Sequence, residues 1–383
     1  MQVVIIGGRL QGVEATYLAK KAGWQTVVVD IDHNAPAAGL GDVFKNIDAL
    51  NKKELALALE GADFIIPAIE NNAVLASLKE CAETLSIPLV YDERAYKISS
   101  SKVRSNQLFA TISIPVPQSY PACGFPVIVK PSGLSGSEGV RLVEDLTELN
   151  KIIADNRGVQ LVIEEPLEGP YYSIEVISWK GRHELLQITE LGMDDQYDCK
   201  MVIAPAGLSD ELEQQFRDIA LLLAQSLNME GIFDIEVILH AGLMKVLEID
   251  ARLPSQTPTA VYNSSGINML EVLWSFFSNK NFSGFAKTKI RGCVYEHVKI
   301  SQLGVEVCGE HIMGNAGRLS LRENFFGADE ALTNYVSGKE EWVATLITTA
   351  ETRAQALEKM NAVVNRIRDD WSSFESGCRR GQR

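Results

Sequence analysis

The sequence contains no closely spaced cysteine pair. Its six cysteines stand far apart, without CxxC spacing: Cys81, Cys123, Cys199, Cys293, Cys308 and Cys378. This distribution excludes redox and metal motifs built on CxxC and is typical of reduced cysteines that pack inside a cytosolic protein. No run of 18 apolar residues exists, which argues against a membrane-spanning helix, and the chain begins as a strand rather than as a signal peptide. We therefore expect a cytoplasmic protein with no membrane partner.

The sequence also lacks an excess of positive charge. It carries 36 Lys and Arg against 50 Asp and Glu, a net charge of -14, and no basic stripe. This balance excludes nucleic acid as an expected partner and is compatible with small substrates that carry amines. The length of 383 residues predicts two or three modules, and the sequence has no internal repeat or low-complexity segment.

The first ninety residues alternate apolar runs with helical spacing. Strands are expected at 2–6, 26–29 and 64–66 and near 89–90, with helical patterns between them. Such alternation predicts an α/β fold with a parallel, doubly wound sheet, in which ligands approach the carboxyl ends of the strands. The module is Rossmann-like.

The glycine turn after the first strand has the order GGxxxG, formed by Gly7, Gly8 and Gly12. A dinucleotide site needs the order GxGxxG, with Asp30 binding a ribose, so NAD binding is disfavoured. Two interpretations stay open: the turn exposes N–H groups to a substrate carboxylate, or it is a tight strand-to-helix connection.

The segment 231–259 has the pattern of a β-hairpin. A three-residue, glycine-containing loop is expected at its tip, which pairs His240 with Met244. This register places Glu236 directly opposite Glu248.

Two facing carboxylates in a half-buried sheet repel each other unless a cation lies between them. Alternation places Asp250 on the face of Glu248, which gives three hard oxygen ligands suited to Mg²⁺, with Arg252 beside them to contact anionic oxygen. The alternative is the solvated face of an edge strand. We favour a phosphoryl-transfer site because other phosphate-binding patterns occur upstream.

One such pattern is VIVKPSGLSGSEGV. Lys130 ends a strand, and the following loop includes Ser135, Gly136 and Ser137, whose hydroxyl and N–H groups are suited to phosphate oxygens. The loop is not a Walker A motif because no GK[ST] closes it. A flexible turn is the alternative interpretation.

A second pattern is a break between two strands at Glu164, Glu165, Pro166 and Leu167. Proline cannot donate within a sheet, so this hinge leaves backbone groups available to an adenine edge, although an ordinary connector has the same appearance. Lys102, at the start of an expected helix, is a further candidate phosphate contact.

The order and spacing of these residues resemble the ATP-grasp superfamily. The resemblance implies an ATP-grasp fold with an N-terminal Rossmann-like pre-ATP-grasp domain, and ATP and Mg²⁺ as cofactors. It implies that Lys102 and Lys130 contact phosphates, that Glu164, Glu165 and Leu167 form the adenine hinge, and that Glu236 and Glu248 hold Mg²⁺. Asp250 stands where the superfamily usually has asparagine. The expected divisions are 1–108 (pre-ATP-grasp), 109–168 (lid with the glycine-rich loop), 169–370 (catalytic domain) and 371–383 (tail).

Several further segments resemble a family of ATP-grasp amino acid ligases in pyrrolysine biosynthesis. They are GGRLQGVEATYLAKKAG at the N-terminus, YDCKMV at 197–202, LEIDARLPSQTPT at 247–259, YNSSGIN at 262–268 and YEH at 295–297. The resemblance implies that ATP phosphorylates the carboxylate of (3R)-3-methyl-D-ornithine, and that the Nε of L-lysine attacks the acyl phosphate, releasing ADP and phosphate. D-Ornithine is the expected surrogate. Arg252 would stabilise the transition state, and Glu236 or bound phosphate would take the proton of the amine.

Recognition of two amino acids requires groups for ammonium and carboxylate. The candidates are Leu10, Gln11, Glu70, Ser173, Glu175, Asp198, Arg252, Ser255, Gln256 and Thr257. Three alternatives stay open: an ATP-grasp ligase for another amino acid pair, an NAD-dependent dehydrogenase, and a nucleotide-binding regulator. The sequence leaves both a monomer and a homodimer open.

Overall fold

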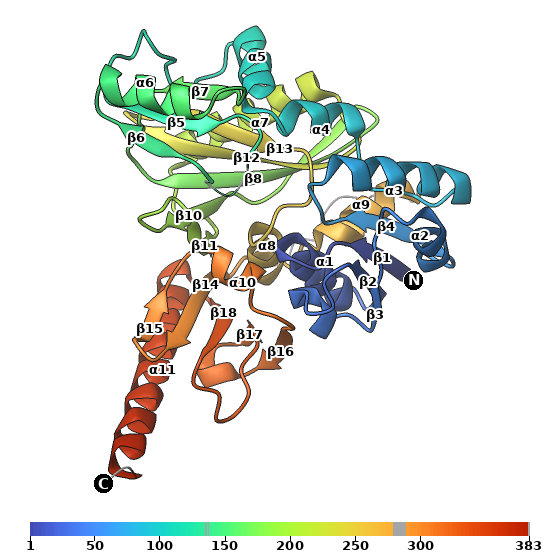
Figure 1. The fold of residues 1–383 in the computed structure, drawn as a ribbon, viewed down its shortest axis with the longest axis vertical. Helices are drawn as coiled ribbons and strands as arrows, with labels where there is room; N and C mark the ends of the chain where they lie inside the picture. Colours follow the sequence, from blue (N-terminus) through green and yellow to red (C-terminus); the bar gives the residue numbers. More distant parts are fainter. Residues whose placement is uncertain (135, 137, 279–288, 382–383) are drawn as a thin grey trace. The chain divides into compact units, whose positions relative to one another are not determined.

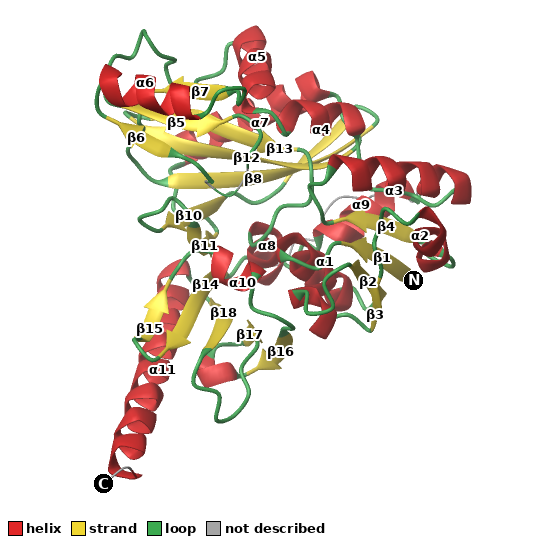
Figure 2. Cartoon of the chain, viewed as in Figure 1, coloured by secondary structure: helices red, strands yellow, loops and turns green. Residues whose placement is uncertain are grey.

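The computed structural model describes residues 1–134, 136, 138–278 and 289–381 (Figures 1 and 2). The chain forms two compact units. The first comprises Met1–Val90, Leu191–Pro205 and Pro254–Arg383, and the second Tyr91–Glu190 and Ala206–Leu253. Both mix helices and strands, which agrees with the predicted α/β class. The divisions expected at residues 108, 168 and 370 stay predictions.

The N-terminal part of the first unit is a four-stranded parallel sheet of order β3-β2-β1-β4. Its strands are β1 (Gln2–Ile6), β2 (Gln25–Asp30), β3 (Val43–Asn46) and β4 (Phe64–Pro67), and its helices are α1 (Leu10–Lys21), η1 (Pro36–Gly39), α2 (Lys52–Leu59) and α3 (Asn72–Leu85). Three strands agree with the sequence analysis, whereas β3 was not expected because it is short and partly exposed. The strand expected near 89–90 contributes one bridge, from Leu89 to Ile65.

The glycine turn after β1 is shaped by close packing. Gly7 has φ +106°, and a Cβ there would lie 2.1 Å from the carbonyl oxygen of Ala68. A Cβ on Gly12 would lie 2.1 Å from the oxygen of Gly7, so only glycine lets α1 start here. The Asp30 carboxylate accepts a 2.6 Å hydrogen bond from the Gly8 N–H, which ties β2 to the turn itself.

The rest of the first unit is built on an antiparallel sheet of order β11-β14-β18-β17-β16, with β15 paired to β14. Its strands are β11 (Cys199–Ala204), β14 (Gly292–Ser301), β15 (Gly304–Val307), β16 (Ser320–Glu323), β17 (Glu330–Thr333) and β18 (Trp342–Ala350). The accompanying helices are α8 (Thr257–Ser265), α9 (Met269–Phe277), α10 (His311–Gly314), η2 (Phe325–Gly327) and α11 (Arg353–Gly381).

Helix α11 covers β14 and β18 with an apolar face. The buried residues of that face are Ala356, Met360, Val363, Val364 and Ile367. The helix continues to Gly381 and therefore includes most of the segment 371–383 that was expected to be a tail.

The second unit contains a sheet of order β13-β12-β8 with β9 paired to β8, all antiparallel. Its strands are β8 (Tyr171–Trp179), β9 (Arg182–Leu185), β12 (Gly231–His240) and β13 (Leu243–Asp250). Its helices are α4 (Glu93–Ser99), α5 (Lys102–Ile112) and α7 (Asp210–Leu227), and α7 packs Phe216 and Leu223 against Phe233 and Ile235 of β12. One face of β12 is therefore apolar, and the alternate residues Asp234 and Glu236 lie on the other face.

A smaller antiparallel sheet of order β6-β5-β7 belongs to the same unit. It consists of β5 (Val127–Pro131), β6 (Arg141–Val143) and β7 (Leu161–Glu164), covered by α6 (Leu146–Asp155). The chain crosses between the units within β10 (Thr189–Met193). Within the described ranges, no helix is both long enough and apolar enough to cross a membrane.

Candidate active site

The hairpin of β12 and β13 places Glu236 directly opposite Glu248, as the sequence predicts. The expected loop was wrong by one residue: His240 pairs with Leu243, and the two-residue loop Ala241-Gly242 has positive φ at both positions, 50° and 82°. Positive φ at both positions is what a type I′ hairpin turn requires. A β-bulge after Glu236 compensates for the shorter loop and restores the pairing of the two carboxylates.

The same face of the sheet carries two further acidic pairs. Asp234 lies opposite Asp250 on β13 and opposite Glu175 on β8, and Glu236 lies opposite Ser173 on β8. The structure thus brings Ser173 and Glu175 beside the metal candidates, although they are some sixty residues away in the chain. The sequence analysis missed Asp234, even though alternation from Glu236 was enough to place it on this face.

Two cations balance part of this charge. Lys102 Nζ lies 2.9 Å from Glu248 Oε2, and Arg252 Nη2 donates to Asp250 Oδ2 at 2.9 Å. Lys102 is the first residue of α5, whose N-terminus is capped by Ser101, and its Nζ also donates to the carbonyl oxygen of Leu134.

The electrostatics follow from this packing. Burial lowers the pKa of Lys102, but Glu248, Asp250 and Glu236 together hold it above its usual value. Burial raises the pKa of Glu248, yet Lys102 and two further cations keep it below its usual value. The pKa of Asp234 is raised well above normal, chiefly by burial and then by Asp250. The facing carboxylates of Glu236 and Glu248 are placed where one cation could lie between them.

The structure describes some of the residues that are expected to contact the phosphates and the adenine. Lys130 Nζ lies 2.6 Å from Glu164 Oε1, because β5 and β7 are paired neighbours. Ser135 and Ser137 lie outside the described residues, and Gly136 has φ +59°.

At the hinge, the Glu165 N–H already donates to the Gln118 carbonyl oxygen at 2.9 Å, and the Glu165 carboxylate pairs with Lys245. The Leu167 N–H makes no hydrogen bond to any residue that the structure describes. Leu167 therefore keeps a donor for an adenine edge, whereas the Glu165 N–H is used within the protein.

The first unit holds the remaining candidates. Gln11 Nε2 donates to Glu70 Oε1 at 2.9 Å, next to Leu10 at the start of α1, so these three residues form one group. A second group is Ser255, Gln256 and Thr257, at the N-terminus of α8.

The Gln256 backbone is strained. Its φ of 69° and ψ of -58°, with a 2.8 Å hydrogen bond from the Thr257 N–H to the Ser255 oxygen, define a γ-turn. The side chains of Ser255 and Gln256 both donate to Glu310, at 2.8 and 2.6 Å. The buried Gln256 Oε1 and Thr257 Oγ1 have no hydrogen-bond partner within the described part of the chain. Water, an ion or a substrate can satisfy buried polar atoms of this kind.

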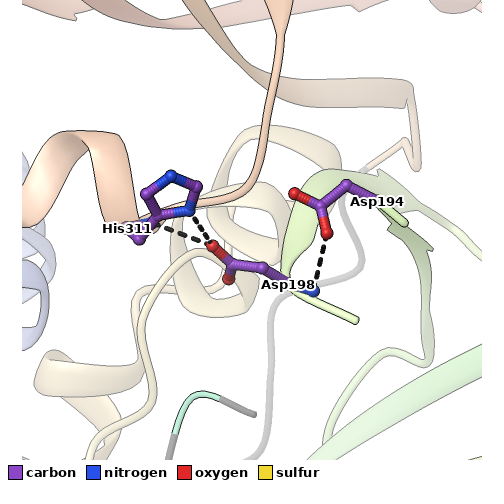
Figure 3. A group of neighbouring side chains, drawn as sticks. All are labelled: Asp194, Asp198 and His311. Atoms are coloured by element: carbon purple, nitrogen blue, oxygen red, sulfur yellow. Dashed lines mark hydrogen bonds and ion pairs between the residues drawn. The ribbon is translucent and has the colours of Figure 1, made fainter. Parts of the chain in front are cut away.

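Asp198 belongs to a group with Asp194 and His311 (Figure 3). Asp198 Oδ2 accepts hydrogen bonds from His311 Nδ1 at 2.5 Å and from the His311 N–H at 3.1 Å. Asp194 accepts from the backbone N–H groups of Gln196, Asp198 and Gly309. These bonds anchor the 194–198 turn to the start of α10. The sequence analysis missed Asp194 and His311, which no local pattern connects to Asp198.

Comparison with known proteins identifies the family. Residues 99–256 match the model of the ATP-grasp domain. A 3-methyl-D-ornithine–L-lysine ligase of Methanosarcina mazei is 38% identical over 317 residues, which cover 82% of each chain. The protein belongs to this ligase family. The ligase of the same name from Methanosarcina acetivorans is 37% identical over 318 residues, covering 82% of this chain and 84% of the relative.

Solved structures agree with the fold. N5-carboxyaminoimidazole ribonucleotide synthetase (purK), in complex with ADP, superimposes with a TM-score of 0.70 at 15% identity, over 96% of this chain and 97% of that one. The biotin carboxylase domain of Hydrogenobacter thermophilus 2-oxoglutarate carboxylase, in complex with MgADP, ADP and bicarbonate, gives 0.72 at 16% identity, over 94% and 89%. The prediction of an ATP-grasp fold with a parallel N-terminal sheet is confirmed, and the protein is an ATP-grasp ligase.

Proposed function

We propose that the protein uses ATP to join the carboxylate of (3R)-3-methyl-D-ornithine to the Nε of L-lysine, in pyrrolysine biosynthesis. The names of the Methanosarcina relatives support the substrate pair. The single observation in the structure that supports the chemistry is the facing pair Glu236 and Glu248, with Lys102 and Arg252 beside it.

The facing carboxylates fit a divalent metal ion because two like charges opposite each other in a sheet need a cation between them. Glu236 and Glu248 would hold Mg²⁺, and Asp250 would complete the set of oxygen ligands. The metal ion would supply positive charge to the phosphoryl oxygens during transfer.

ATP would bind across the second unit. Lys102 and Lys130 are point charges for phosphate oxygens, and the Leu167 N–H is a donor for the adenine edge. Arg252, 17% exposed at its side chain, would pair with the acyl phosphate and with the oxyanion of the tetrahedral intermediate.

The reaction divides into two displacements. The substrate carboxylate attacks the γ-phosphorus, the β–γ bond breaks, and ADP leaves. The lysine Nε then attacks the acyl carbon, the C–O bond to phosphate breaks, and the amine loses its proton to phosphate or to Glu236. The amino acids would be bound by Ser173 and Glu175 in the second unit. In the first unit, the proposed contacts are Leu10, Gln11, Glu70, Asp198, Ser255, Gln256 and Thr257.

The test is the identity of the products. With ATP, Mg²⁺, L-lysine and D-ornithine, we expect one amide through the lysine Nε, detected by mass spectrometry, together with ADP. An acyl phosphate requires cleavage of the β–γ bond, whereas adenylation cleaves the α–β bond. AMP as the product, or an amide at the lysine Nα, would refute the proposal even if ligation occurred.

We also propose a cytoplasmic location, which the free state of Cys81, Cys123, Cys199, Cys293 and Cys308 supports. Light scattering decides between the monomer and the homodimer that the sequence leaves open.

A further inference from the structure

The side-chain amide of Gln256 has partners at its nitrogen and none at its oxygen. The residue is buried, with 4% of its surface exposed. Its Nε2 donates to Glu310 Oε2 at 2.6 Å and, in a longer contact of 3.5 Å, to the Cys199 carbonyl oxygen. Its Oε1 has no hydrogen-bond partner among the residues that the structure describes. A buried oxygen in this position is costly unless a water or a ligand brings a donor to it.

Glu310 decides which end of the amide is left over. A glutamine amide can exchange the places of its oxygen and nitrogen by rotation about its last torsion, so its neighbours set its orientation. An ionised carboxylate and a backbone carbonyl oxygen only accept, and the nitrogen must therefore face Glu310 and Cys199. Ser255 Oγ donates to the same Oε2 of Glu310 at 2.8 Å, which helps to hold the carboxylate in place. The Gln256 oxygen is thus fixed as an acceptor that points away from Glu310.

The usual structural use of such an oxygen is not made here. Gln256 is the N-cap residue of α8, where a side-chain oxygen can accept from an N–H group of the first helical turn. The Gln256 side chain makes no such bond. The N–H of Thr259, in that first turn, instead donates to the carboxylate of Glu14 on α1. Capping by Glu14 leaves the Gln256 oxygen for a different donor.

The chemistry of an amino acid limits what that donor can be. Gln256 belongs to the segment SQTPT, which follows Arg252 in the chain and which the proposed function assigns to amino acid binding. The carboxylate of an amino acid only accepts hydrogen bonds, whereas its ammonium groups only donate. An oxygen held as an acceptor therefore fits an ammonium group and does not fit a carboxylate.

We propose that Glu310 is a positioning residue, which orients the Gln256 amide so that its oxygen accepts a hydrogen bond from an ammonium group of an amino acid substrate. The inference rests on the proposed function. It adds the direction of the hydrogen bond at Gln256 and the residue that sets this direction.

The first test is Glu310→Gln. An amide at position 310 can donate as well as accept, so Gln256 is free to adopt either orientation. We expect the KM for one amino acid, D-ornithine or L-lysine, to rise about fivefold, because a hydrogen bond to a charged group is weakened, while kcat and the KM for MgATP change less than about twofold. Glu306→Gln, the same change at an exposed position of β15, is the matched control and should change neither KM. Unchanged KM values for both amino acids, or a common rise that includes MgATP, would overturn the inference.

The second test exchanges the two side chains, in the double variant Gln256→Glu with Glu310→Gln. The amide at position 310 can then donate to the carboxylate at position 256, whose other oxygen takes the place of the Gln256 oxygen. Only the long contact to the Cys199 carbonyl oxygen is not rebuilt. An ammonium group binds a carboxylate at least as well as an amide, so the KM that rises in Glu310→Gln should return to the wild-type value or below it. If Gln256 donates to a substrate carboxylate instead, the new carboxylate repels the substrate and the KM should rise further, which would contradict the inference.

Calorimetry separates the inference from the proposed function. Each amino acid is titrated into the protein with Mg²⁺ and a non-hydrolysable ATP analogue. Binding that Glu310→Gln weakens and the double variant restores, without any amide product, would support the inference and refute the proposed function alone. Ligation in the wild type with equal affinities in Glu310→Gln would refute the inference alone, and no binding of either amino acid to the wild type would refute both. If Glu310→Gln does not fold, the double variant carries the test, and weaker binding than in the wild type would count against the inference.

Discussion

Glu236 and Glu248 face each other in the hairpin, yet their replacement by glutamine should affect stability to different extents. At Glu236, glutamine removes one of two facing negative charges. At Glu248, glutamine removes the partner that lies 2.9 Å from the Lys102 ammonium. The metal-free protein should therefore distinguish the two variants before any activity is measured.

The magnitude follows from the geometry of the ion pair. At 2.9 Å and an effective dielectric constant of about 20, the Coulomb attraction between Lys102 and Glu248 is about 6 kcal/mol. The side chains are 18% and 29% exposed, and desolvation offsets most of this attraction. Asp250 and Glu236 still attract Lys102 in the variant, so we expect Glu248→Gln to lower the free energy of unfolding by about 1–2 kcal/mol. Glu236→Gln should change it by less than about 1 kcal/mol, because the repulsion that is relieved offsets the attraction of Glu236 to Lys102 that is lost.

The assay is urea unfolding in the presence of EDTA, in which the free energies of unfolding of the variants and the wild-type protein are compared provided that their m-values agree. The measurement is then repeated with Mg²⁺ and ATP. In the second series both variants should lose the stabilisation that ligand gives to the wild-type protein, and both should lose ligation. Glu213→Gln, which breaks an exposed pair with Arg217 on α7, is the control and should change stability by less than about 0.5 kcal/mol. Equal stability of the two hairpin variants, or near-native turnover of either one, would refute the reasoning.

Three further predictions concern other parts of the chain. Burial raises the pKa of Glu296 from its usual 4.5 to about 7, so the folded protein holds an extra proton between these values. The free energy of unfolding should then fall as the pH rises through that range, by up to about 3 kcal/mol, and Glu296→Gln should abolish this slope in urea titrations. Gly139 has φ +77°, and a Cβ there would lie 2.8 Å from the Cγ of Pro131 in β5, so Gly139→Ala should distort the glycine-rich loop and raise the KM for ATP. The control is Gly61→Ala, which has a similar φ of +78° but open space around the Cβ and should leave the KM unchanged. Because Asp30 already accepts the Gly8 N–H, calorimetry should detect no NAD or NADP binding, and micromolar affinity for either would revive the dehydrogenase alternative.

The acidic hairpin could be predicted because it depends on neighbours in the chain. Strand alternation and a glycine-containing loop were sufficient to pair Glu236 with Glu248. The loop length was wrong because the sequence gives no signal for the β-bulge that follows Glu236. The loop is one residue shorter than expected and the β-bulge adds one residue, so the two differences cancel and the carboxylates still face each other.

The contacts that could not be predicted join distant parts of the chain. Nothing local to Glu175 says that β8 pairs with β12, so the pairing of Glu175 with Asp234 appears only in the folded sheet. The pairing of Asp198 with His311 spans 113 residues and has the same cause. Alternation within one strand is readable from sequence, but the choice of a partner strand depends on the whole fold.

In the loop before α8, Gln256 combines a strained backbone with a side-chain amide that makes a stabilising hydrogen bond. A γ-turn with positive φ is rarely adopted by residues other than glycine and costs about 1–3 kcal/mol. Glycine at Gln256 would relieve this cost but would remove the amide that donates to Glu310 and that presents an unsatisfied Oε1. A residue with a side-chain amide therefore occupies this position although its backbone is strained. This combination is expected where the amide itself contacts a ligand. The same argument does not apply to Ser255, whose backbone is unstrained and whose hydroxyl already donates to Glu310. Of the residues of this loop, Gln256 is thus the one that we propose contacts the substrate.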